Sequence, residues 1–149
     1  YLMVGQGARK DELEAEAARQ GLANVIFAGE VAREKVVQFV LASDAVLVHL
    51  KKTELFEHVI PSKIFEIMAC GRPIIMGVGG EAGRLVAEAQ AGVVMEPENA
   101  EEFVGAIEAL RSDAALGGRL SKSGRAFVEA HFDREALAEK YLSILSRVV

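Results

Sequence analysis

The chain has 149 residues, of which 51% are hydrophobic and 26% charged, a composition typical of one globular domain and unlike that of a disordered or membrane-spanning chain. Its 17 Lys and Arg residues against 22 Asp and Glu residues give a net charge of −5, which argues against nucleic acid as a partner. The single cysteine, Cys70, excludes an intrachain disulfide and a multi-cysteine metal site, and fits a protein of the reducing cytoplasm.

Short apolar runs alternate with amphipathic segments along the first hundred residues. The runs predict five strands, at Tyr1–Val4, Val25–Phe27, Ala45–Leu50, Pro73–Met76 and Gly92–Met95. Between them, apolar residues recur at helical spacing, as at Val36, Val37 and Val40. Strands that alternate with helices form βαβ units, so we predict an α/β fold with a doubly wound parallel sheet whose strands are buried on both faces.

The pattern after Pro97 is helical only. Apolar residues predict helices at Ala100–Arg111, Leu116–Phe132 and Arg134–Val149. We expect these C-terminal helices to cap the sheet or to pack on a neighbouring domain.

Ligands of open α/β sheets bind beyond the carboxyl ends of the strands. This rule selects five loops, at residues 5–10, 28–33, 51–61, 77–83 and 96–100.

Two of these loops are rich in glycine. Gly5 and Gly7 precede a helix, where they serve either a plain turn or a ligand loop. The run Gly77–Gly83 precedes a predicted helix at Arg84–Gln90 and fits G-x-G-x-x-A, with Glu96 after the next strand. The second loop therefore allows a dinucleotide site, or a backbone loop that faces a phosphate or a sugar.

The loop from Lys51 to Pro61 is the longest, and long loops after strands are often functional. It leads into a helix that we expect to end at Gly71, with Lys63 and Glu66 on its polar flank. On spacing alone, this flank is either a solvated helix face or part of a site.

The segment after this loop, Pro61 to Pro73, reads P-S-K-I-F-E-I-M-A-C-G-R-P. It closely resembles the donor-site helix of retaining glycosyltransferases of the GT-B fold, the group 1 or family 4 class. Other segments agree in order and spacing: V-G-Q-G at Val4, N-V-I-F-A-G at Asn24, A-S-D-A at Ala42 and A-G-V-V at Ala91. The resemblance covers nearly the whole chain and implies the Rossmann-like C-terminal half of such an enzyme, a fragment that lacks the first βα unit and the acceptor-binding half.

The resemblance also implies a function and residue roles. A nucleotide-sugar, with UDP favoured over GDP, would donate a hexose or N-acetylhexosamine to a lipid-linked or glycan acceptor with retention, in bacterial polysaccharide synthesis. Glu66 would bind the ribose hydroxyls, and Glu57 or His58 would lie near the sugar, although the family has a glutamate where His58 stands. The remaining donor contacts would come from the first two loops and the start of the donor helix: Gly5, Gly7, Gly29, Glu30, Val31, Pro61, Ser62 and Lys63.

The same resemblance implies no metal and no further cofactor, and no activity for this half alone. It places the enzyme in the cytoplasm, with association at the inner face of the membrane through the missing half, to which the helix at 134–149 would cross. Three alternatives stay open: a UDP-sugar 2-epimerase of the same fold, an NAD-binding domain that uses Gly77–Ala82 with Glu96, and a non-catalytic sensor domain.

Overall fold

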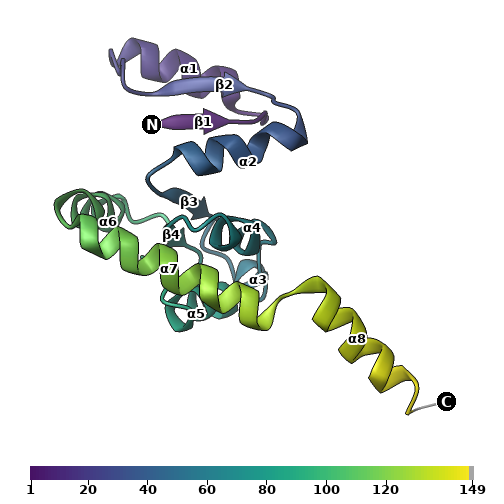
Figure 1. Cartoon of the computed structure of the whole chain (residues 1–149). Coiled ribbons are helices and arrows are strands. Elements are labelled where there is room, and N and C mark those ends of the chain that lie inside the picture. The colour runs from purple at the N-terminus through teal and green to yellow at the C-terminus, as the bar shows by residue number, and fades with distance from the viewer. Residues whose placement is uncertain (148–149) are drawn as a thin grey trace. The chain divides into compact units, whose positions relative to one another are not determined.

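The computed structural model describes residues 1–147 and shows an α/β fold with parallel strands (Figure 1). The chain divides into two compact units, Tyr1–Phe39 and Val40–Val149. All five predicted strands are present, each within a few residues of its predicted bounds.

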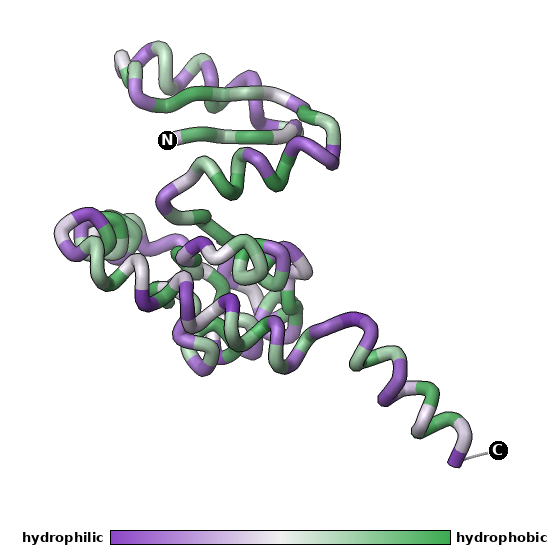
Figure 2. The backbone as a smooth tube through the Cα atoms, viewed as in Figure 1, coloured by the Kyte–Doolittle hydropathy of each residue, from purple (hydrophilic) through white to green (hydrophobic). Residues whose placement is uncertain are grey.

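The first unit is built around two strands. It contains β1 (Leu2–Val4), α1 (Lys10–Arg19), β2 (Ile26–Gly29) and most of α2 (Arg33–Ala42). β1 and β2 pair in parallel, with Leu2 opposite Ile26. Their apolar side chains are 37–59% exposed at Leu2, Met3, Val4 and Ile26, and Figure 2 shows both strands as hydrophobic. Burial on both faces, which we predicted for every strand, does not hold here, and the helices α1 and α2 also contain no buried residue.

The second unit holds a three-stranded parallel sheet in the order β3 (Val46–His49), β4 (Ile74–Gly77) and β5 (Gly92–Val94). Central strand β4 is buried along its whole length. Its side chains alternate between two hydrophobic clusters, with Ile74 and Met76 in the larger cluster and Ile75 in the smaller one. β4 is therefore buried on both faces, as predicted.

Six helices follow β3 in the described part of this unit: α3 (Glu54–Glu57), α4 (Lys63–Ala69), α5 (Gly80–Glu88), α6 (Ala100–Ser112), α7 (Ala114–His131) and α8 (Arg134–Leu145). The larger cluster lies between the sheet and helices α4, α5 and α7. The smaller cluster lies between the sheet and α6. Helices therefore cover both faces of this sheet, which is the doubly wound arrangement.

Several helix boundaries differ from the prediction. The helix expected at Arg84–Gln90 begins at Gly80, because Gly80 with φ +61° turns the chain directly into the helix and Glu81 and Ala82 continue it. The short helix α3 lies inside the predicted 51–61 loop. Helix α4 ends as expected, with Gly71 at φ +61° just after its last residues.

The last predicted helix, Arg134–Val149, is described as α8 up to Leu145, and residues 148 and 149 lie outside the described part. No side chain of α8 is buried, and its apolar residues Tyr141, Leu142 and Leu145 are exposed. Among residues 1–147, no helix combines the length and hydropathy required to cross a membrane.

Candidate functional site

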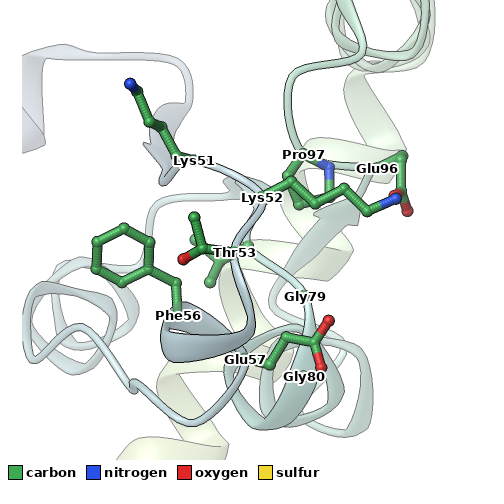
Figure 3. Close-up of a pocket in the computed structure, with 10 residues that line it drawn as sticks. Lys51, Lys52, Thr53, Phe56, Glu57, Gly79, Gly80, Glu96 and Pro97 are labelled. Carbon is green, nitrogen blue, oxygen red and sulfur yellow. The ribbon is translucent and has the colours of Figure 1, made fainter.

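The carboxyl ends of β3, β4 and β5 open onto a pocket of about 300 Å³. Because parallel strands end at the same edge of their sheet, the loops that follow them come together there. Ten residues of three loops line this strand-end pocket: Lys51, Lys52, Thr53, Phe56, Glu57, Val78, Gly79, Gly80, Glu96 and Pro97 (Figure 3). Three of the five loops selected from the sequence thus meet at one site.

Glu57 reaches the pocket because α3 packs against the first residue of α5. A Cβ added at Gly80 would lie 1.9 Å from the carbonyl oxygen of Glu57. Figure 3 shows the Glu57 carboxylate close to Gly80 on the pocket wall. The packing of α3 therefore explains why residue 80 is a glycine. A dinucleotide fingerprint that begins at Gly77 does not require a glycine at this position.

Hydrogen bonds connect the loop after β3 with the loop after β5. The Lys52 amide donates to Glu98 Oε2 at 3.0 Å, and the Glu98 amide donates to His49 Nε2 at 3.0 Å. The Lys52 ammonium also pairs with the Glu96 carboxylate. The hydrogen bond and charge of Glu96 raise the pKa of Lys52, which stays protonated at neutral pH. Since both side chains of this pair are half-exposed or more, it adds little to stability and can exchange with a ligand.

Helix α4 presents a buried side and a charged side. Ile64, Ile67 and Met68 are buried in the larger cluster. Lys63 and Glu66 are exposed, and within residues 1–147 neither makes an ion pair. Their charges are therefore available to a ligand.

The two predicted donor loops of the first unit lie against each other. The Gly5 amide donates to the Gly29 carbonyl at 2.7 Å, at the carboxyl ends of β1 and β2. Both glycines have positive φ, +127° and +70°. Space is open around the Cβ positions of Gly5, Gly7 and Gly29, so the backbone of these turns is accessible. Beyond Gly29, Glu30 is exposed and Val31 is half-buried.

The predicted site residues of the second unit divide into two groups. Glu57 lines the strand-end pocket, whereas His58 caps α3 outside it. The remaining ones, Pro61, Ser62, Lys63 and Glu66, surround the start of α4 and do not line the pocket.

Sequence reasoning did not assign Lys52 or Glu96 to a donor site, although the strand-end rule selected their loops. Among residues 1–147, no three His, Cys, Asp or Glu side chains gather as metal ligands would.

Comparison with known proteins gives one family. The family model described as "Glycosyl transferases group 1" matches residues 1–127. The chain is 28% identical over 145 residues to the lipopolysaccharide core biosynthesis glycosyltransferase LpsE of Rhizobium meliloti. It is 27% identical over 146 residues to a GDP-mannose-dependent phosphatidylinositol monomannoside mannosyltransferase of Corynebacterium glutamicum. These matches cover 97% of this chain but 41% and 38% of the relatives.

Solved structures agree with the family model. The crystal structure of Anabaena Alr3699/HepE in complex with UDP matches with a TM-score of 0.83 and 25% identity. The match covers 98% of this chain and 40% of that protein. The chain thus spans about two fifths of the length of each of these three proteins.

Proposed function

The chain belongs to the group 1 glycosyltransferases, and we propose that it is the part of such an enzyme that binds a nucleotide-sugar donor. The observation that carries this proposal is the charged flank of α4, where Lys63 and Glu66 form no ion pair within residues 1–147. The family model matches residues 1–127, which include this flank. The fold, like that of the C-terminal half of GT-B enzymes, places this flank and the strand-end pocket after the strands of one sheet.

The donor groups would bind along α4 and the pocket. The Glu66 carboxylate suits two adjacent ribose hydroxyls, which donate charge-assisted hydrogen bonds to it. The exposed Lys63 ammonium, with Ser62 beside it, would offset the charge of the diphosphate. Glu57 lies in the pocket, where it would contact the sugar, with His58 next to it in the chain. Within the first unit, the accessible backbone of Gly5, Gly7 and Gly29–Val31 remains a predicted contact of the nucleotide.

The nucleotide we propose is UDP, because a structure that matches over nearly the whole chain is a complex with UDP-glucose. One relative is named as GDP-mannose-dependent, so GDP is the nucleotide to compare with UDP. We propose that the sugar goes to a lipid-linked or glycan acceptor with retention, without a bound metal. The acceptor would be held by a further part of the enzyme, against which the exposed apolar residues of α8 would pack.

The first prediction concerns Glu66. Titration of the isotope-labelled chain with UDP, GDP and NAD, followed by NMR, measures even weak binding. We expect UDP to bind and Glu66→Ala to weaken it about tenfold to a hundredfold, since a hydrogen bond to a charged group is worth about 1.5–3 kcal/mol. Glu108→Ala, which removes another exposed glutamate, should leave the affinity unchanged.

Two outcomes would contradict the proposal. Binding of NAD that is indifferent to Glu66→Ala would favour a nicotinamide-binding domain. Binding of UDP with equal affinity by the wild type and Glu66→Ala would remove Glu66 from the site. If GDP binds more tightly than UDP and Glu66→Ala weakens it as much, the proposed base is wrong but the proposed function as a donor-binding part stands.

A further inference from the structure

The hydrogen bonds between the two pocket loops form a clasp of three residues, His49, Lys52 and Glu98. His49 ends β3, Lys52 follows it in the next loop, and Glu98 lies between β5 and α6. Glu98 is the link, since its amide donates to His49 Nε2 and its carboxylate accepts from the Lys52 amide. Because β4 lies between β3 and β5, the clasp joins the two outer strands beyond the end of the central one.

The backbone at two positions is adapted to this clasp. Glu98 has φ +63°, which lies in the left-handed region that is unfavourable for a residue with a side chain. At Gly77, the last residue of β4, a Cβ would lie 2.7 Å from His49 Cδ2 and 2.7 Å from Met95 Cε. Glycine thus leaves room for the imidazole over the end of β4, and the strain at Glu98 persists because the clasp holds its amide toward His49.

The pocket that the clasp borders suits an uncharged polar group. Its ionisable lining consists of two lysines, Lys51 and Lys52, and two glutamates, Glu57 and Glu96, so their charges cancel. Ammonium groups donate and carboxylates accept hydrogen bonds, and sugar hydroxyls do both. A volume of about 300 Å³ is at the lower end for ligand pockets, which fits a monosaccharide better than a whole nucleotide-sugar.

We propose that His49 is a positioning residue of the donor site. Through Glu98, His49 holds the segment at Lys52 in place, and this segment forms the pocket wall that contacts the sugar of the donor. This inference rests on the proposed function and extends it to residues outside the α4 flank. In this contact Nε2 is the acceptor, so the side chain at position 49 must present an acceptor atom to the Glu98 amide.

The test compares a nucleotide with its sugar derivative on the isotope-labelled chain. Wild-type chain, His49→Leu and His49→Gln are titrated with UDP and with UDP-glucose, and with GDP and GDP-mannose as a second pair. The side-chain amide oxygen introduced by His49→Gln can replace Nε2 as the acceptor, whereas leucine cannot. His131→Leu, which removes a histidine at the end of α7, is the matched control.

We expect His49→Leu to weaken the nucleotide-sugar about threefold to tenfold, as for one lost hydrogen bond, and to leave the free nucleotide unchanged. His49→Gln should restore the affinity, and His131→Leu should have no effect. Glu98→Ala, which keeps the histidine but removes the acceptor of the Lys52 amide, should repeat the loss. A scalar coupling between the Glu98 amide nitrogen and His49 Nε2 should be present in the wild type.

Distinct results would overturn the inference and the proposed function. If the nucleotide-sugar binds equally well to the wild type, His49→Leu and Glu98→Ala, or if the scalar coupling is absent, the inference is wrong while nucleotide binding through Glu66 stands. If neither nucleotide nor nucleotide-sugar binds the wild type, both fail.

Discussion

Gly79 and Gly80 are neighbours in the sequence with different surroundings in the fold. Gly79 has φ −75°, and nothing lies within 4 Å of the position of its missing Cβ. Gly80 has φ +61°, and a Cβ added to it would lie 1.9 Å from the Glu57 carbonyl oxygen. Only the second glycine is required by the packing of α3 on α5, and this contact places Glu57 in the strand-end pocket.

Gly80→Ala should therefore destabilise the chain by about 2–4 kcal/mol, from the unfavourable φ and from the displacement of α3 backbone. Gly79→Ala, the matched control, should cost no more than about 1 kcal/mol, because alanine is a poorer N-cap of α5 than glycine but meets no backbone there. Urea unfolding followed by circular dichroism measures both. An equal loss of unfolding free energy in Gly80→Ala and Gly79→Ala would show that the contact with Glu57 does not determine the destabilisation.

Three helices of the second unit begin with the same capping device. The Asn99 side chain accepts hydrogen bonds from the amides of Glu101 and Glu102, each at 3.1 Å, at the start of α6. Asp113 caps α7 and Asp133 caps α8 through one amide each. The helices differ in what they bury, since α6 covers one face of the sheet and α8 has no buried residue.

Removal of the N-cap side chain should therefore have different effects on α6 and on α8. Asn99→Ala should lower the free energy of unfolding by about 1 kcal/mol, the usual value of such a cap, because α6 unfolds together with the core. Asp133→Ala should fray α8 while leaving the midpoint of global unfolding unchanged. Urea unfolding gives the midpoint, and NMR shifts of α8 report its helicity. A lower midpoint in Asp133→Ala would mean that α8 is part of the cooperative unit.

The strongly buried side chains are unevenly distributed over the whole molecule. Every fully buried apolar residue belongs to the second unit, and residues 1–39 contain none. In the second unit the buried residues surround β4 and extend into α4, α5 and α7. Local stability rises with the number of buried contacts that must open, so it should differ between the units.

Amide hydrogen exchange should show this difference. We expect the slowest exchange at Ile75 and Met76 in β4, and exchange faster by orders of magnitude in β1, β2 and α8. The chain as it stands, measured by NMR at neutral pH, is the sample. Similar protection in β1 and β4 would show that the first unit is as stable as the sheet of the second.

Local patterns in the sequence were enough to predict the strands, the class of fold and the family. Apolar runs reveal strands because a residue's preference for a strand depends mostly on its near neighbours. The segment from Pro61 to Pro73 indicated the family, which the match over residues 1–127 confirms. The predicted start of α5 is wrong by four residues. The segment 77–83 contains four glycines, which indicate a loop unless the contact of Gly80 with Glu57 is known.

The pocket itself could not be derived from these patterns. Lys52, Gly80 and Glu96 come from three loops that are far apart in the chain, and only the order β3-β4-β5 brings them together. The clasp of His49 with Glu98 joins residues 49 positions apart and depends on a missing side chain at Gly77. A local pattern records the preference of each segment, whereas distances between segments arise from the packing of the whole sheet, and the chemistry of the site depends on those distances.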